Sequence, residues 1–155
     1  ILFDQLAKDY GNVPAQMLLV PVQVNLTAAE KQAVLQNLDL LTDAGIEAED
    51  FGGSTVVVRA VPADMDAGDV PAAIEEICEK LRRGKSVDPK AARDEILHTV
   101  ACKAAIKAGW KTSDQELYAL AQQVMSREDL KYCPHGRPIC VSLSKKQVEK
   151  QFKRT

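Results

Sequence analysis

The sequence of 155 residues is 46% hydrophobic and 27% charged, which is enough apolar material for the core of one domain or of two small lobes. Its formal net charge of -2 excludes an overall positive field that would hold nucleic acid, so such binding would depend on local clusters of charge. No apolar run is long enough to cross a membrane, no signal peptide is recognisable, and four cysteines without secretory features indicate a reducing compartment.

The first ten residues have the spacing of a helix with one apolar face. Leu2 and Leu6 are four residues apart, and Phe3 and Tyr10 are seven apart. No residue that could cap the helix precedes them, because the sequence opens with Ile1. We therefore expect that the sequence is a piece of a longer protein.

Residues 17–26 alternate between apolar and other residues, as in a strand with one buried face. Pro21 has no backbone N–H to donate, so this strand is expected at the edge of a sheet or with a bulge. An edge strand preceded by Gln16 is also a place where a partner protein could dock a short extended segment. The simpler alternative is an edge strand without a partner.

The next residues predict a helix followed by a hairpin. Thr27 and Glu30 form a capping box that opens the helix, and Gly45 ends it. Residues 46–51 and 54–61 have the character of strands and are joined by two glycines, which favours a β-hairpin.

Two further helices follow the hairpin. The first begins near Pro71 and places Cys78 on its apolar stripe, so Cys78 is interpreted as a core residue. The second begins with Asp88 and the proline after it, an N-cap and first-turn pair, and runs to about Ala108.

Cys102 lies on this second helix, roughly 130° around the axis from the centre of a stripe of small residues. Packing therefore gives no simple reason for a cysteine at this position. His98 lies four residues earlier and projects from the same side of the helix.

The C-terminal part predicts a helix and a strand. Ser113 and Glu116 form a second capping box, and the helix behind it has apolar residues that indicate a buried face. These residues are Leu117, Leu120, Val124 and Met125. Residues 139–143 predict a strand in which Cys140 alternates away from its apolar neighbours, and Cys140 is interpreted as a packing residue rather than a ligand.

A last helix, opened by Ser144, brings basic residues together at the C-terminal end. Five basic residues stand against only Glu149, which leaves a net charge of +4 on a short segment and suits contact with phosphate. The basic residues are Lys145, Lys146, Lys150, Lys153 and Arg154. The alternative is a solvated helix face.

The run from Cys133 to Pro138 can point a thiol and an imidazole at one metal ion, because prolines and a glycine keep it out of regular helix. Arg137 beside these groups would suit a phosphate. Two ligands do not make a site, so partners must come from elsewhere in the chain. From the residues alone, two options stay open: a closed zinc site, or no metal at all, with a buried cysteine beside a turn histidine. The closed site would consist of His98, Cys102, Cys133 and His135.

This run, Cys133-Pro134-His135-Gly136-Arg137-Pro138, resembles the CPHGRP motif in the C-terminal domain of the MutL family of DNA mismatch-repair proteins, in the form that carries an endonuclease. Ala101-Cys102-Lys103 and the residues after it resemble a second motif, and Phe152-Lys153-Arg154 resembles the closing FKR element. Residues 16–21 are similar to the segment with which these domains bind the replication sliding clamp. The four matches follow the family order over nearly the whole chain.

The resemblance implies an α+β fold with two lobes. Residues 1–26 and 112–155 would form a dimerisation lobe with the metal site. Residues 27–111 would form an inserted regulatory lobe that ends in the helix carrying Cys102.

The resemblance also implies an activity, the metal-dependent nicking of one DNA strand. Cys102, Cys133 and His135 would bind metal together with acidic and His ligands from an upstream motif that this chain lacks. Asp4-Gln5-Leu6-Ala7 is similar to that motif, but Leu6 stands where the family has a histidine, so the similarity is interpreted as accidental. Thiolate and imidazole ligands favour zinc, and an exchangeable manganese or magnesium ion would activate the site. The catalytic residues are thus unknown, Arg137 is expected to contact phosphate, and the chain is expected to be inactive alone.

The partners implied are a second copy of the chain, double-stranded DNA, the sliding clamp and, through the full-length protein, a mismatch-recognition protein. DNA would be contacted by Lys150, Lys153 and Arg154. The clamp would be bound by Gln16, Met17, Leu18, Leu19, Val20 and Pro21. ATP binding would belong to an N-terminal domain that the chain lacks. The expected location is the bacterial cytoplasm, near the nucleoid and not in a membrane.

Two other classes of function stay open. The chain could be a non-catalytic dimerisation and clamp-binding module with a structural zinc site, although a lost nuclease would have no reason to keep Cys102, Cys133, His135 and Arg137 together. It could also be a zinc-stabilised interaction domain without chemistry. Chelation separates these cases, because removal of a structural zinc unfolds a domain whereas removal of a catalytic one leaves the core folded.

Overall fold

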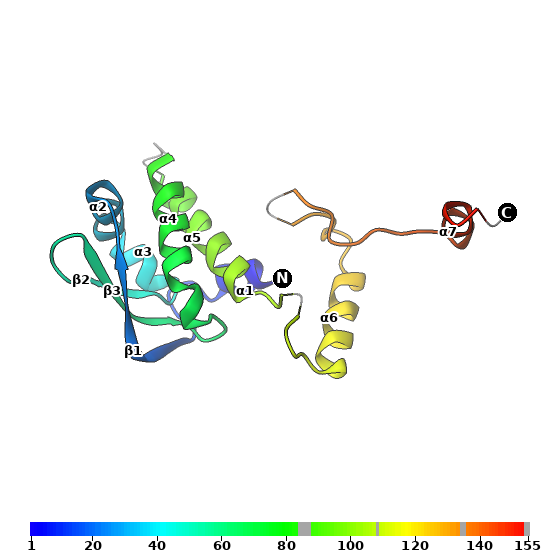
Figure 1. The fold of residues 1–155 in the computed structure, drawn as a ribbon, viewed down its shortest axis with the longest axis horizontal. Coiled ribbons are helices and arrows are strands. Elements are labelled where there is room, and N and C mark those ends of the chain that lie inside the picture. Colours follow the sequence, from blue (N-terminus) through cyan, green and yellow to red (C-terminus); the bar gives the residue numbers. More distant parts are fainter. Residues whose placement is uncertain (84–87, 108, 134–135, 154–155) are drawn as a thin grey trace. The chain divides into compact units, whose positions relative to one another are not determined.

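The computed structural model of this protein describes residues 1–83, 88–107, 109–133 and 136–153. The chain divides into two compact units, Ile1–Lys107 and Ala108–Thr155, and each is described by itself (Figure 1). The described part combines helices and strands, which confirms the predicted α+β class. Within it, every helix is too short or too polar to cross a membrane.

The first unit contains an antiparallel sheet of three strands in the order β1-β3-β2. The strands are β1 (Ala15–Asn25), β2 (Glu47–Asp50) and β3 (Thr55–Pro62). β2 and β3 form the hairpin that residues 46–61 predict. β3 is central and almost entirely buried, which explains its run of valines and alanine in place of a strict alternation.

β1 is an edge strand with a break in its register. Met17 pairs with Ala60 but Val22 pairs with Val58, so residues 18–21 lie opposite Arg59 alone. Pro21 falls within this bulge, where the ladder does not need its missing N–H. The expectation of an edge strand or a bulge around Pro21 is confirmed on both counts.

Helices cover this sheet and pack on one another, and the core lies between them (Figure 1). The helices of the first unit are α1 (Leu2–Lys8), α2 (Ala28–Gln36), α3 (Leu38–Asp43), the short 3-10 helix η1 (Ala67–Asp69), α4 (Val70–Arg83) and α5 (Pro89–Ala104). α4 packs against both α2 and α5, and α1 packs against α5. Fully buried side chains come from β3, α4 and α5. They include Val56, Val58, Val61, Ile74, Ile77, Ile96 and Leu97.

Local capping signals predict where the helices begin. Thr27 caps α2 in a capping box with Glu30, and Asp88 with Pro89 opens α5, as expected. The expected single helix before Gly45 is instead two helices that meet at Asn37, whose φ of -122° departs from the helical value. The side-chain amide of Asn37 donates to the carbonyl oxygen of Ala33 at 2.7 Å, which satisfies an acceptor at the end of α2.

The second unit contains α6 (Asp114–Ser126) and α7 (Lys145–Gln151), both opened by capping boxes. None of its described residues is buried. The expected buried face of α6 is therefore wrong for the isolated chain, because Leu117 and Met125 are 46% and 79% exposed. The helix forms from its cap and its spacing, but the described residues of its own unit do not cover its apolar side.

The strand expected at residues 139–143 does not form. The described chain has only an isolated bridge between Tyr132 and Pro138 at this place, and the N–H of Ile139 donates to the carbonyl oxygen of Lys131 at 3.1 Å. A strand needs a partner backbone, which the described residues do not provide here. Cys140 is consequently exposed, so its interpretation as a packing residue is wrong within this chain.

The boundary between the units, after Lys107, lies close to the expected end of the inserted lobe. β1 shares its sheet with β3, so residues 15–25 belong to the same unit as residues 55–62. The grouping of residues 1–26 with 112–155 in one dimerisation lobe stays a prediction.

Candidate metal centre

The residues around Cys133 form a tight turn closed by backbone hydrogen bonds. The N–H of Cys133 donates to the carbonyl oxygen of Arg137 at 2.8 Å, and the N–H of Gly136 donates to the carbonyl oxygen of Cys133 at 2.8 Å. Gly136 has a φ of +77°, a conformation that glycine adopts without steric cost. His135 and Pro134, which the sequence also assigns to this site, lie outside the described residues.

The sulfur of Cys133 accepts a hydrogen bond within this turn. The N–H of Arg137 donates to Cys133 Sγ at 3.4 Å. Cys133 is also partly exposed. A cysteine sulfur in an accessible turn fits the role of a metal ligand, and two cysteines with an imidazole match the donors that zinc prefers.

Cys102 lies in the last turn of α5 and is partly exposed, between the buried residues Ala101 and Ala104. It belongs to the first unit, whereas Cys133 belongs to the second. Among the residues that the structure describes, three or more His, Cys, Asp or Glu side chains do not gather in a way that could hold a metal ion. The site predicted from Cys102, Cys133 and His135 stays a prediction.

His98 packs on α1. Its ring meets that of Phe3 edge-on, with centroids 4.2 Å apart and planes at 66°. One turn before Cys102, this histidine thus has a structural contact at the α1–α5 interface.

A second contact gives the direction in which α1 crosses α5. The guanidinium carbon of Arg93 lies 5.3 Å from the centroid of the Tyr10 ring. Phe3 in α1 is therefore level with His98, and Tyr10, which follows α1, is level with Arg93, so residues 3–10 pass α5 from its C-terminal half toward its N-terminal end. With a rise of about 1.5 Å per residue, Cys102 lies roughly 6 Å beyond His98 along the axis, on the side of the N-terminal end of α1. The sequence predicts both helices but contains no signal for this direction.

Cys78, in contrast to the partly exposed Cys102 and Cys133, is a core residue. Cys78 is fully buried in α4, and its Sγ lies 3.7 Å from the carbonyl oxygen of Glu30. Burial raises its pKa to about 11, which keeps it protonated and unreactive. Its interpretation as a core residue is confirmed.

The expected clamp-binding segment forms the bulge of β1 and the residues before it. Met17, Leu19 and Val20 are 68%, 103% and 77% exposed, which is compatible with docking. The side-chain amide of Gln16 is engaged within the fold, because its Nε2 donates to the carbonyl oxygen of Met65 at 2.8 Å. The assignment of residues 16–21 to the clamp stays a prediction.

The basic residues expected to contact DNA lie at and after α7. Lys150 and Lys153 are exposed, and Lys145 lies 3.8 Å from Glu149 in an ion pair of adjacent turns. Arg154 lies outside the described residues. An exposed cluster of lysines suits phosphate, and DNA binding stays a prediction.

A family model for the MutL C terminal dimerisation domain matches residues 1–112. The chain belongs to this family. It is similar to the DNA mismatch repair protein MutL of Heliobacterium modesticaldum, with 36% identity over 154 residues, which cover 99% of this chain and 23% of that protein. The MutL of Caldanaerobacter subterraneus subsp. tengcongensis is 35% identical over 154 residues, which cover 99% of this chain and 26% of that protein.

Membership in the MutL C-terminal dimerisation family confirms the resemblance that the motifs indicate. The chain spans about a quarter of the length of these relatives. The family model ends before the Cys133 turn, but the similarity to the two MutL proteins extends over 154 residues and so includes the turn and the basic C-terminal segment.

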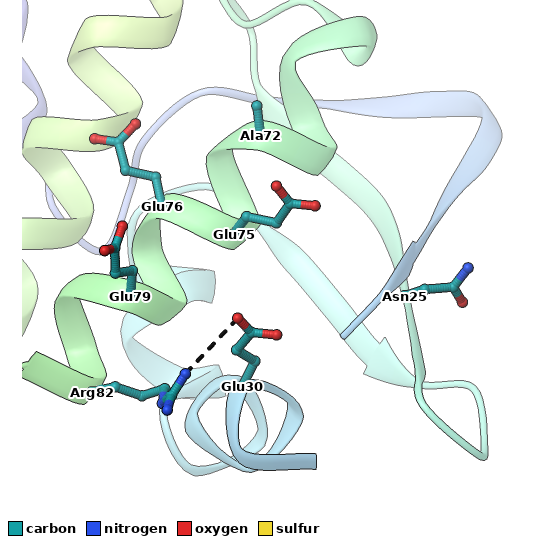
Figure 2. Close-up of a pocket in the computed structure, with 7 residues that line it drawn as sticks. All are labelled: Asn25, Glu30, Ala72, Glu75, Glu76, Glu79 and Arg82. Atoms are coloured by element: carbon teal, nitrogen blue, oxygen red, sulfur yellow. Dashed lines mark ion pairs between the residues drawn. The ribbon is translucent and has the colours of Figure 1, made fainter. Parts of the chain in front are cut away.

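A groove of about 500 Å3 lies elsewhere in this member of the MutL family, between the end of β1, α2 and α4. Its lining is acidic: Glu75, Glu76 and Glu79 project from α4 and Glu30 from α2 (Figure 2). Arg82 lies 3.9 Å from Glu30 across it. None of the residues that the sequence assigns to metal, DNA or clamp lines this groove.

Proposed function

We propose that the chain mediates homodimerisation of a DNA mismatch-repair protein and contributes ligands to a metal centre that nicks one strand of DNA. The observation that carries the dimerisation is the exposed apolar surface of the second unit. Tyr118, Val141 and Phe152 are 67%, 73% and 74% exposed, and the described residues of the unit include no buried one. A unit without a core must cover such a surface with another partner, and a second copy is the partner that the family's description supports.

The dimer is tested with α6. In the full-length protein, replacement of Leu117 and Val124 by Glu should shift the sedimenting species from dimer to monomer at micromolar concentration. Gln123→Glu is the matched control, because it adds the same charge about 120° around the helix from Leu117. A wild-type protein that sediments only as a monomer would reject the proposal.

The position of α1 supports the metal centre. In a protein that includes the upstream acidic motif, the residues before Ile1 would approach α5 on the side of His98 and Cys102, because Phe3 contacts His98 whereas Tyr10 contacts Arg93. Carboxylates and a histidine from that motif would then lie at the same end of α5 as Cys102. Cys133 and His135 would complete the ligand set.

The chain's own residues have separate roles in this proposal. Cys102, Cys133 and His135 hold the metal, and Arg137 orients the DNA phosphate through its guanidinium. Bound divalent ions would supply a Lewis acid and lower the pKa of water for hydrolysis of a phosphodiester. The general base would come from outside this chain, because the named ligands include no carboxylate.

Nicking is tested with supercoiled plasmid and Mn2+. A protein that includes the upstream acidic motif should convert the plasmid to the open circle, and Cys133→Ala or His135→Ala should abolish this activity. The 155-residue chain should not nick. Equal nicking by this chain, abolished by the same two changes, would place the carboxylates within it and contradict the proposed ligand set.

A structural zinc in a non-catalytic module is the second candidate. The absence of buried residues among those described in the second unit favours it, because a small unit without a core often depends on a metal for its fold. Chelation separates the two functions. Loss of helical circular dichroism together with zinc supports the structural role, whereas loss of nicking with the fold retained supports the catalytic one.

A further inference from the structure

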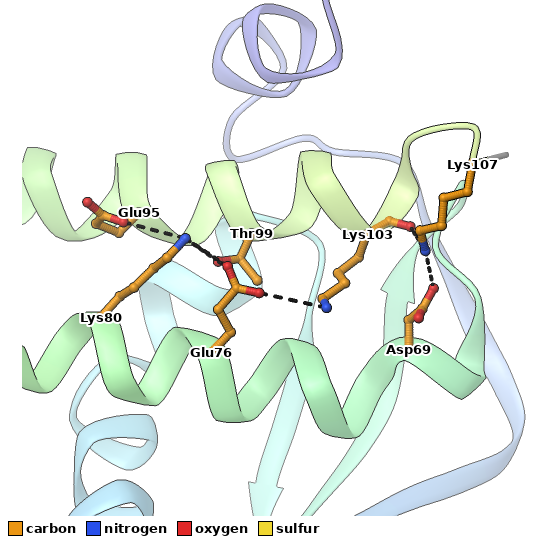
Figure 3. Close-up of polar contacts among 7 residues, drawn as sticks. All are labelled: Asp69, Glu76, Lys80, Glu95, Thr99, Lys103 and Lys107. Carbon is orange, nitrogen blue, oxygen red and sulfur yellow. Dashed lines mark hydrogen bonds and ion pairs between the residues drawn. The ribbon is translucent and has the colours of Figure 1, made fainter. Parts of the chain in front are cut away.

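A cluster of polar side chains joins α4 to α5 (Figure 3). The hydroxyl of Thr99 donates to Glu76 Oε1 at 3.2 Å and accepts from Lys80 Nζ at 3.0 Å. Lys80 Nζ also lies 2.9 Å from Glu76 Oε1. Thr99 is completely buried, so its hydroxyl depends on these two partners and not on water.

The same cluster continues along α5 toward its C-terminal end. Lys103 Nζ lies 3.7 Å from Glu76 Oε2. After the helix ends, Lys107 Nζ lies 2.7 Å from Asp69 Oδ2 and donates to the carbonyl oxygen of Lys103 at 3.1 Å. Thr99 and Lys103 are four residues apart on one face of α5 and attach that face to α4, and Lys107 attaches the segment after α5 to η1.

Cys102 lies between these anchored residues. It follows Thr99 by three residues and precedes Lys103 by one, which places it about 60° from Thr99 around the axis. A rotation or slide of α5 that moved Cys102 would separate Thr99 from Glu76 and leave a buried hydroxyl without partners, which is unfavourable. The cluster thus restricts the rotation and the axial position of the part of α5 that carries Cys102.

We propose that Glu76 and Thr99 are positioning residues for Cys102, which set the affinity of the chain for zinc through the rotation of α5. The inference rests on the proposed metal centre. Residues that hold a metal ligand in position strengthen metal binding, because the ligand then loses little conformational freedom when the metal binds. Loss of such a residue typically weakens metal affinity by about ten- to a hundred-fold.

The test measures the zinc affinity of the full-length protein by competition with a chromophoric chelator. Thr99→Val removes the hydroxyl and keeps the shape, whereas Thr99→Ser keeps the hydroxyl. We expect Thr99→Val and Glu76→Gln to weaken zinc binding about ten-fold and Thr99→Ser to bind like the wild type. Glu79→Gln is the control on the same helix, because Glu79 pairs with Arg83 outside the cluster.

A second readout separates positioning from a general loss of stability. With Co2+ at saturation, the thiolate-to-cobalt absorption should be weaker or shifted in Thr99→Val and Glu76→Gln, while the circular dichroism of the apo proteins is unchanged. If Thr99→Val does not fold, the zinc affinity and the cobalt spectrum of Glu76→Gln decide whether the positioning role holds, because this change removes only the charge of a partly exposed side chain.

Cys102→Ser in the same assay distinguishes this inference from the proposed function. If Cys102→Ser leaves zinc affinity unchanged, the metal centre is wrong and this inference with it. If Cys102→Ser weakens binding but Thr99→Val and Glu76→Gln bind zinc like the wild type with the same cobalt spectrum, only the positioning role is overturned.

Discussion

Phe3 and His98 meet edge-to-face at 4.2 Å, and this contact fixes the end of α1 against the middle of α5. α1 has no fully buried residue, so it is held by partly buried side chains along one face. The contact does not depend on any metal.

Phe3→Ala should therefore loosen α1 without unfolding the sheet. Loss of the ring contact and of its partly buried area is expected to lower the free energy of unfolding by about 1–2 kcal/mol. Phe51→Ala is the matched control, because Phe51 is 55% exposed and should change stability little. Hydrogen exchange of residues 2–8 should accelerate only in Phe3→Ala. Equal exchange in both variants would mean that α1 does not depend on this contact.

The cap of α2 is a separate and local source of stability. The backbone N–H of Glu30 donates to Thr27 Oγ1 at 3.3 Å, and Glu30 Oε2 accepts from the N–H of Thr27 at 2.8 Å. Thr27→Ala should lower the free energy of unfolding by about 1 kcal/mol in urea denaturation. Thr42→Ala, at an exposed position within α3, should be neutral or slightly stabilising because alanine is the better helix former.

The α4–α5 cluster should make stability depend on pH. Burial disfavours the charged form of Glu76, but hydrogen bonds and charges from Lys80, Lys103 and Thr99 outweigh it and hold the pKa of Glu76 below its usual value. A carboxyl group with a lowered pKa stabilises the fold above its unfolded pKa, and this contribution is lost as the pH falls through the folded value.

Denaturation of the wild type and of Glu76→Gln at several pH values measures this contribution. The difference in the free energy of unfolding between the two proteins should be largest near neutral pH and shrink in acid. A difference that stays constant down to acid pH would show that the charge of Glu76 does not contribute.

The cysteines should differ in their reaction with iodoacetamide. Cys140 is exposed and should be alkylated in the native protein. Cys78 is buried with a pKa raised to about 11, so it should react only after unfolding. Mass spectrometry of peptides after a short reaction at mild alkaline pH measures both sites. Native alkylation of Cys78 would mean that α4 opens readily.

The bulge of β1 offers the sharpest test of clamp binding. Leu19→Ala should weaken binding of the full-length protein to the sliding clamp about ten-fold or more without a change in stability, because this side chain is 103% exposed. Gln16→Ala should weaken binding and also remove the hydrogen bond to Met65. Gln23→Ala, on the regularly paired part of β1, is the control. Unchanged binding in calorimetry for Leu19→Ala would exclude this segment as the docking site.

The sequence by itself determines the helix starts, the hairpin and the family. Each cap depends on residues that are two or three positions apart, as with Thr27 and Glu30 or Ser113 and Glu116, so the contact is present in the local sequence. The bulge at Pro21 is equally local, since a missing N–H restricts where the residue can lie in any sheet. The motifs around Cys102 and Cys133 identify the family because they keep their order along the chain.

The tertiary structure alone decides what each element meets. Three contacts join residues that are at least 23 positions apart: the rings of Phe3 and His98, the hydrogen bond between Thr99 and Glu76, and the hydrogen bond from Gln16 to Met65. Periodicity contains no information on such pairs. Residues 139–143 have the alternation of a strand but remain without a partner in the described chain. Alternation reports which side chains prefer burial, whereas a strand also requires a neighbouring backbone to accept and donate its hydrogen bonds.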